Sequence, residues 1–133
     1  MIDSKIIKIA SNTKYAGLKN IYTHKSSLKN SLCGDKIKLE LVAKNSKIDF
    51  IRYETESCIL CEASASLLAN KIKLYPIKNL KKDIIMLKKM INKRDFDLPG
   101  RFKKYKDLLS SKNLSRNNCI ILPLNALLKA FKI

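Results

Sequence analysis

The sequence predicts an α+β fold, a compact single domain over residues 1–133 in which an antiparallel sheet packs against helices. Two adjacent stretches, Lys36–Ala43 and Ile48–Thr55, alternate apolar and polar residues as half-buried strands do. The flanking stretches have apolar residues at helical spacing. A chain of this length usually forms one domain, and it buries about two-thirds of its unfolded surface without needing disulfides.

The segment before the predicted sheet contains one short helix and a long loop. Ile2–Ala10 has apolar residues at helical spacing and is expected to be an N-terminal helix. Asn12–Ser31 is polar and rich in turn formers, so a loop is expected there. The single histidine, His24, lies in this loop and is expected to be solvated rather than to act as a ligand. Lys44–Lys47 is expected to be the turn between the two strands.

Two helices are predicted directly after the second strand. Glu62–Ile72 is rich in small, helix-compatible residues, and Ser57 is a candidate N-cap for it. The next stretch has apolar residues at i, i+4, i+7 and i+11, the spacing of an amphipathic helix with a lysine-covered solvent face. These residues are Leu80, Ile84, Leu87 and Ile91.

Two further helices are predicted towards the C-terminus. Arg101–Ser111 follows a Pro-Gly break and is expected to be a shorter helix with one apolar side. That side consists of Phe102, Tyr105, Leu108 and Leu109. A final helix begins near Cys119. Pro123 is expected to be tolerated only near its first turn, because proline cannot donate a helical hydrogen bond.

The composition is strongly basic, with a formal charge of +17 from 24 Lys, 4 Arg and 11 acidic residues. Such a charge invites a nucleic-acid interpretation. Against it, the Lys are scattered along the chain, and Arg, which favours base readout, is scarce. Lys, Ile and Asn together account for 52 of 133 residues, as A/T-rich codon usage would produce. Nucleic acid is therefore an unlikely partner, whereas a positive surface can steer the protein towards an acidic one.

No stretch resembles a signal peptide or a membrane span, so a cytoplasmic protein is expected. In that compartment the four cysteines are expected to be reduced. Clustered reduced cysteines favour metal or sulfur chemistry. The alternative for each one is a small buried apolar residue.

The predicted hairpin brings three potential ligands to one edge of the sheet. Cys33 and Asp35 directly precede the first strand, and Cys58 directly follows the second. Antiparallel strands lie about 5 Å apart, so the outer ends of the pair are neighbours. Gly34 allows the turn between Cys33 and Asp35. Two thiolates and a carboxylate suit tetrahedral Zn²⁺ or a small iron–sulfur cluster, although a chance arrangement at a hairpin base remains open.

Cys119 is the candidate fourth ligand, since it is the remaining cysteine outside this region and starts a helix, whose N-terminal end stabilises a thiolate. Cys61 forms a CxxC pair with Cys58, but no second pair completes a zinc ribbon and no βαβ order favours a redox dithiol. Cys61 is therefore expected to be a buried or auxiliary thiol.

Three segments together resemble the NifU/IscU/SufU-type iron–sulfur cluster assembly scaffolds, over about Leu32 to Phe131. They are "LCGDKIKLEL", "SCILCEASASLLAN" and "CIILPLNALLKAF". The resemblance implies a SufE/NifU-like fold with a three-stranded antiparallel sheet packed against helices. It also implies Cys33, Asp35, Cys58 and Cys119 as metal- or cluster-binding residues, with Cys33 and Cys119 as candidate persulfide acceptors.

The sequence departs from the family pattern at several positions. Asn118 stands where the IscU branch has a His, Ser57 stands where a Gly is usual, and "LSRNN" replaces the chaperone-recognition segment. The long step from Cys58 to Cys119, with the extra helical segment Arg101–Ser111, is closer to the SufU-type branch, which resembles zinc-bound sulfur acceptors.

The leading hypothesis is an iron–sulfur cluster assembly scaffold that accepts sulfur from a cysteine desulfurase and serves downstream cluster acceptor proteins. Its cofactor would be Zn²⁺ or a transient [2Fe–2S] cluster. One alternative is a zinc-dependent sulfurtransferase that relays persulfide, so enzyme status stays open. A second is a basic nucleic-acid-binding module with a structural zinc.

Overall fold

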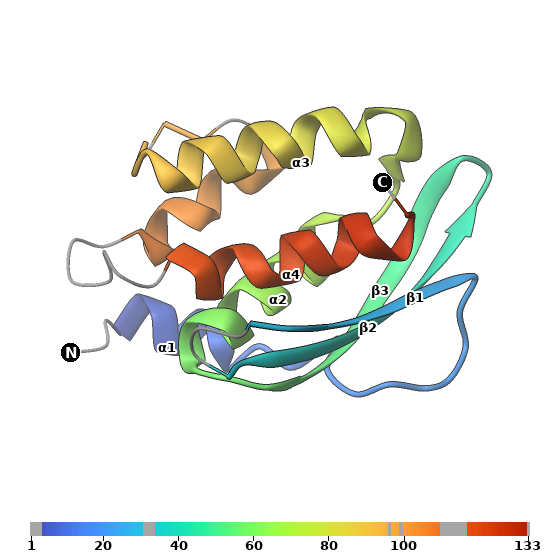
Figure 1. The fold of residues 1–133 in the computed structure, drawn as a ribbon, viewed down its shortest axis with the longest axis horizontal. Helices are drawn as coiled ribbons and strands as arrows, with labels where there is room; N and C mark the ends of the chain where they lie inside the picture. The colour runs from blue at the N-terminus through green and yellow to red at the C-terminus, as the bar shows by residue number, and fades with distance from the viewer. Residues whose placement is uncertain (1–3, 31–33, 96, 99, 110–116, 133) are drawn as a thin grey trace.

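The computed structural model describes residues 4–30, 34–95, 97–98, 100–109 and 117–132. A twisted sheet forms one layer, and helices cover one of its faces (Figure 1). In chain order the elements are α1 (Ser4–Ala10), β1 (His24–Lys29), β2 (Lys36–Lys44), β3 (Lys47–Glu56), α2 (Ile59–Lys71), β4 (Tyr75–Pro76), α3 (Ile77–Asn92), the 3₁₀ helix η1 (Gly100–Leu108) and α4 (Asn117–Ala130). The predicted α+β class, with an antiparallel sheet packed against helices, is confirmed.

The central hairpin forms as the alternation predicts. β2 pairs antiparallel with β3, and Lys36 at the start of one strand faces Glu56 at the end of the other. Asn45 and Ser46 join the strands with φ of 54° and 62°, the left-handed pair that a two-residue hairpin turn requires. The start of β2 and the end of β3 therefore lie side by side, at the same end of the sheet.

The sheet has four strands in the order β1-β2-β3-β4, so the expected count of three is wrong. β1 lies within the stretch predicted to be a loop, and His24 is its first residue. Because β1 is an edge strand with the polar sequence HKSSLK, it lacks the apolar alternation on which a strand prediction depends. β4 comprises only two residues beside the start of β3.

The chain between α1 and β1 first runs beside β3, where Ala16 forms a parallel bridge with Tyr53, and two charged side chains of the sheet hold it further along. Glu40 is buried and accepts backbone hydrogen bonds from Lys19 and Asn20, at 2.5 and 3.0 Å. Arg52, its cross-strand partner, donates to the carbonyls of Gly17 and Ala16. A buried carboxylate is thus satisfied by backbone donors, as burial requires.

Helix α2 lies at the centre of the protein and packs against α1, α4, η1 and β3. Its small residues, Ala63, Ala65 and Ala69 among them, are buried around the whole circumference. The predicted N-cap at Ser57 is wrong: Cys58 occupies that position, and the Ser57 hydroxyl instead donates to the Cys58 carbonyl.

The amphipathic prediction for α3 is confirmed, since the four expected apolar residues are its buried ones. The next predicted helix is present as the 3₁₀ helix η1, and the part of the prediction at Ser110 and Ser111 lies outside the described residues. Phe102, Tyr105 and Leu108 recur every three residues, the period of a 3₁₀ helix, and all three are buried.

Helix α4 departs from the expectation for its proline. Pro123 lies seven residues into a helix that begins at Asn117, well beyond the first turn. Pro123 has no N–H to donate to the carbonyl of Cys119 four residues earlier. Burial compensates, because α4 packs against α2, α3, β1 and β2 and ten of its residues are buried. Among the helices in the described part of the chain, none is long and apolar enough to cross a membrane.

Candidate metal centre

Asp35, Cys58 and Cys119 converge at the edge of the sheet where β2 begins and β3 ends. One ligand atom from each, a carboxylate oxygen and two Sγ atoms, lies within 4.8 Å of the others. Asp35 and Cys119 are buried, with 6% and 3% of their surfaces exposed, and Cys58 is half-buried. These residues come from three places in the chain, so each has its own structural support.

Asp35 and Cys58 are held together by the hairpin and by one direct hydrogen bond. Asp35 immediately precedes β2, and Cys58 lies two residues beyond β3. The backbone N–H of Cys58 donates to Oδ1 of Asp35 at 3.1 Å. Gly34 has φ of +74°, a conformation that glycine adopts readily, and its N–H donates to the Asn30 carbonyl at 2.8 Å. The backbone N–H of Asn30 in turn donates to the Asp35 carbonyl at 2.7 Å, so hydrogen bonds join the end of β1 to the residues just before β2.

Cys119 is the third residue of α4, and the first residue of that helix is anchored to its neighbours. Arg94, just after α3, donates to Oδ1 of Asn117 at 2.6 Å and to the Leu109 carbonyl at 2.8 Å. Cys58 is the N-cap of α2, so two helix N-termini point towards the site.

Two serines that sequence reasoning left without a role attach α2 to its neighbours. The Ser64 hydroxyl donates to the carbonyl of Ile120, next to Cys119, at 2.6 Å. The Tyr105 hydroxyl donates to the Ser64 carbonyl at 3.0 Å, and burial raises the pKa of Tyr105, so this donor stays protonated. Ser66 donates to the Asn12 carbonyl at 2.8 Å. Both serines lie in the segment "SCILCEASASLLAN", which the family resemblance singled out, and that resemblance was the one sequence feature that could have drawn attention to them.

The remaining predicted residues divide between those the structure describes and one that it does not. Cys33 lies outside the described residues. Cys61 is completely buried in the core, within the first turn of α2, and does not belong to the group of three. His24 also lies apart from that group, with its ring centroid 4.5 Å from that of Phe131. As a half-buried residue of β1, it is not the solvated loop histidine that was expected.

The donor set fits a thiophilic metal. Two ligands bound to one tetrahedral Zn²⁺ at about 2.3 Å lie roughly 3.5–3.8 Å apart, so the observed group needs to contract only slightly. Mixed sulfur and carboxylate ligands suit Zn²⁺ or an iron–sulfur centre and are poorly suited to Mg²⁺ or Ca²⁺, which prefer oxygen ligands. The fold and these three side chains define an α+β protein with a candidate metal site where β2 begins and β3 ends.

The chain belongs to the NifU-like N-terminal domain family, whose model matches residues 1–108. The matched range includes Asp35 and Cys58, and Cys119 lies beyond it. The chain is 29% identical over 133 residues to the iron–sulfur cluster assembly scaffold protein IscU of Thermotoga maritima, covering 99% of this chain and 93% of that protein.

Solved structures share the fold at lower identity. A nitrogen-fixing NifU-like protein (N-terminal part) from Brucella abortus superposes with a TM-score of 0.84 at 19% identity, covering 98% of this chain and 91% of that one. The second structure is FiSufU, the SUF-system cluster assembly scaffold protein of the thermophilic Fervidobacterium islandicum AW-1. It superposes with a TM-score of 0.79 at 21% identity, covering 98% of this chain and 96% of that one. Since both an IscU and a SufU-type protein are similar to this chain, the preference for the SufU branch stays a prediction.

Proposed function

We propose that this protein is an iron–sulfur cluster assembly scaffold that accepts sulfur from a cysteine desulfurase and delivers it, as a transient [2Fe–2S] cluster, to acceptor proteins. Residues 1–133 would act as one scaffold domain in the cytoplasm. The observation that carries the proposal is the convergence of Asp35, Cys58 and Cys119 in a chain of the NifU-like family. The named function of the Thermotoga maritima relative supports it.

The assigned ligands are Cys33, Asp35, Cys58 and Cys119. The sulfurs of Cys58 and Cys119 lie beside helix N-termini. A thiolate is the nucleophile that sulfur transfer requires. Cys33 and Cys119 are the proposed acceptors. In the transfer, an acceptor thiolate attacks the outer sulfur of the desulfurase persulfide, a new S–S bond forms, and the desulfurase cysteine leaves as its thiolate. To become cluster sulfide, each transferred sulfur must then gain two electrons, which a dithiol reductant supplies in the reconstitution described below.

Asp35 would complete the ligand set without taking part in sulfur transfer, because a carboxylate is not a sulfur acceptor. Its hydrogen bond from the Cys58 backbone keeps one oxygen directed towards the second strand of the hairpin. Zn²⁺ bound here would hold the thiols deprotonated. A carboxylate is a harder ligand than a thiolate and binds a thiophilic metal more weakly. A centre with one Asp is therefore expected to exchange its metal faster than an all-cysteine centre.

The second candidate is a zinc-dependent sulfurtransferase that relays persulfide and builds no cluster. The helix η1, which accounts for part of the long step between Cys58 and Cys119, favours it. Both candidates use the same residues and differ in cargo.

Anaerobic reconstitution with iron, cysteine, a dithiol reductant and a desulfurase tests the proposal. A scaffold develops visible charge-transfer absorption and binds iron and sulfide in equal amounts. A relay instead gains a persulfide, detected by mass spectrometry, and keeps its zinc. A protein that gains neither cluster nor persulfide would contradict both candidates. The Asp35→Ala variant serves as a control. Because it leaves every cysteine in place, it should still accept sulfur while holding its metal less tightly.

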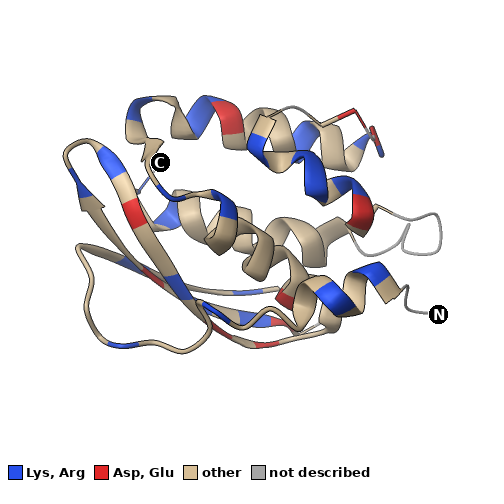
Figure 2. Cartoon of the chain, turned by 180° about the vertical axis from the view of Figure 1, so that it is seen from behind, with Lys and Arg blue, Asp and Glu red and all other residues tan. Residues whose placement is uncertain are grey.

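The third candidate, a nucleic-acid-binding module, gains little support from the distribution of charge. Lys and Arg are distributed over the helical layer and the sheet alike (Figure 2). Any duplex or single-strand binding is expected to disappear at modest salt and to show no sequence preference. Salt-resistant, sequence-selective binding would favour this candidate instead.

A further inference from the structure

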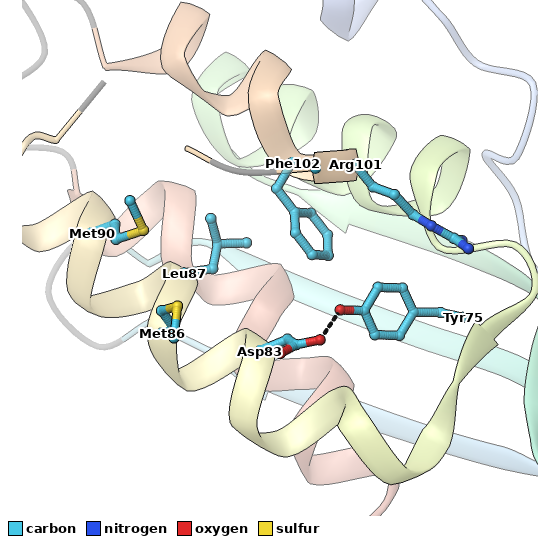
Figure 3. Close-up of a pocket in the computed structure, with 8 residues that line it drawn as sticks. Tyr75, Asp83, Met86, Leu87, Met90, Arg101 and Phe102 are labelled. Atoms are coloured by element: carbon cyan, nitrogen blue, oxygen red, sulfur yellow. Dashed lines mark hydrogen bonds between the residues drawn. The ribbon is translucent and has the colours of Figure 1, made fainter. Parts of the chain in front are cut away.

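An apolar pocket lies between α3 and η1 and shares no lining residue with the metal-binding group. Its volume is about 320 Å³, and the residues used below are Tyr75, Asp83, Met86, Met90, Arg101 and Phe102. Figure 3 shows the methionines and Leu87 on one side and the rings of Tyr75 and Phe102 on the other. We propose that this α3–η1 pocket docks an acidic, amphipathic helical segment of a partner protein, which inserts one or two apolar side chains into it.

The floor and walls of the pocket suit an apolar anchor. Met86 and Met90 are one helical turn apart and therefore share a face of α3. Met86 is 47% exposed, although it is a large apolar residue. Methionine adapts its shape to different partners and recurs at surfaces that bind helices. The centroids of Tyr75 and Phe102 are 5.8 Å apart, so the aromatic wall is formed before any partner binds.

The two helices that border the pocket carry a net positive charge, which favours an acidic partner, while the charged residues that line the pocket itself are Arg101 and Asp83. Helix α3 carries five lysines against one aspartate, and η1 carries three lysines and Arg101 against one aspartate. Arg101 lies 5.1 Å above the Tyr75 ring and donates to the Lys73 carbonyl at 2.6 Å, which holds its charge at the edge of the pocket. An apolar floor with a charged rim is the arrangement of a helix-binding groove.

Other occupants fit this pocket less well. A second copy of this chain carries the same formal charge of +17 and would be repelled. Nucleic acid would leave the methionines without an apolar partner. Inside the pocket, the Tyr75 hydroxyl donates a hydrogen bond to Asp83. Burial raises the pKa of Tyr75, so its hydroxyl remains a donor and Asp83 remains the acceptor.

The test is fluorescence anisotropy with a labelled helical peptide of about 14 residues, composed of glutamates with leucines at i, i+3, i+4 and i+7. The comparison peptide has the same composition in a scrambled order that destroys the apolar face. We expect the patterned peptide to bind at least tenfold more tightly, because only that peptide presents an anchor to the pocket. Equal binding of the two peptides would show that charge alone attracts them, and it would overturn the proposal.

Two substitutions on α3 form a matched pair. Met86→Glu places a carboxylate in the pocket and should weaken binding of the patterned peptide at least tenfold. Ile85→Glu makes the same change in charge on an exposed neighbour outside the pocket and should weaken it only about twofold. Equal responses of the two variants would contradict docking at this pocket.

A third variant tests the electrostatic part. Asp83→Asn removes the one carboxylate of the pocket and should strengthen peptide binding about two- to threefold at low salt, a gain that shrinks as salt rises. Weaker binding after this change would contradict an acidic occupant. Competition by an unlabelled DNA duplex that fully displaces the peptide would point to nucleic acid instead. Because Cys58→Ser should leave peptide binding unchanged, failure here is distinguishable from failure of the proposed metal centre.

Discussion

Cys58 and Cys61 are one helical turn apart, yet the structure places them in different surroundings, and the same substitution at each tests the roles that we propose for them. Cys58 caps α2 and faces Asp35 and Cys119, whereas Cys61 is completely buried in the core. We therefore expect Cys58→Ser to lower metal affinity with little loss of stability. We expect Cys61→Ser to lower stability with little loss of metal.

The expected size of each effect follows from the surroundings of the sulfur. A four-ligand zinc site binds with about 10–16 kcal/mol, so loss of one thiolate removes about a quarter of that and weakens binding roughly a hundred- to a thousandfold. A serine at position 61 instead puts a smaller and more polar group at a completely buried position, at a cost of about 1–3 kcal/mol. For a domain of this size that lowers Tm by about 3–15 °C.

Two measurements separate these effects. Elemental analysis of each purified variant, followed by competition with a chelator of known affinity, reports metal binding. Thermal unfolding of the metal-free proteins reports stability without any contribution from the metal. Cys61→Ala provides the control, because it removes the sulfur without adding a hydroxyl and should recover part of the lost stability.

The reasoning would be refuted by equal loss of metal in the Cys58 and Cys61 variants, since Cys61 would then have to reach the site. It would also be refuted by a Cys58→Ser protein that keeps native metal affinity. In that event the convergence of Asp35, Cys58 and Cys119 would be an arrangement at a hairpin base with no ligand role.

Three further predictions concern the support of the site. Asp35→Asn should keep the fold but release zinc about 10–100-fold faster to a chromogenic chelator, and an unchanged rate would remove Asp35 from the ligand set. Pro123→Ala restores an N–H towards the Cys119 carbonyl, so we expect a higher Tm of the metal-free protein together with weaker metal binding, because the turn that carries Cys119 shifts; a lower Tm would show that the proline ring is needed for packing. Burial raises the pKa of Tyr105 above 10.0, so the neutral phenol stabilises the fold below that pH and this stability is lost as pH rises through the folded-state pKa. The free energy of unfolding should therefore fall above about pH 10, and less steeply in Tyr105→Phe; equal slopes by denaturant titration would exclude Tyr105 as the cause.

The local parts of the fold were predictable because neighbouring residues specify them. Alternation in Lys36–Ala43 and Ile48–Thr55 identified both long strands, and the turn between them determined which ends meet. The spacing of apolar residues identified α3 in the same way. The placement of Asp35 beside Cys58 followed from the hairpin alone.

Elements that depend on distant partners were not predictable in this way. β1 has the polar sequence HKSSLK and forms because β2 offers it an edge and α4 covers it, with the Ser26 hydroxyl donating to the Ala126 carbonyl. Pro123 is accommodated deep in α4 because tertiary burial compensates for one missing hydrogen bond. No window of local sequence contains either cause.

The candidate centre combines both kinds of information. Its candidate ligands are visible in the sequence, because cysteines and an aspartate stand next to predicted strand and helix ends. Its geometry depends on buried polar contacts between segments far apart in the chain, such as Ser64 to the Ile120 carbonyl and Arg94 to Asn117. The first contact joins α2 to the beginning of α4, and the second joins the chain just after α3 to the first residue of α4. A substitution such as Ser64→Ala should therefore disturb the spacing between Cys58 and Cys119 while leaving every ligand in place, which explains why a correct list of ligands does not by itself define a metal centre.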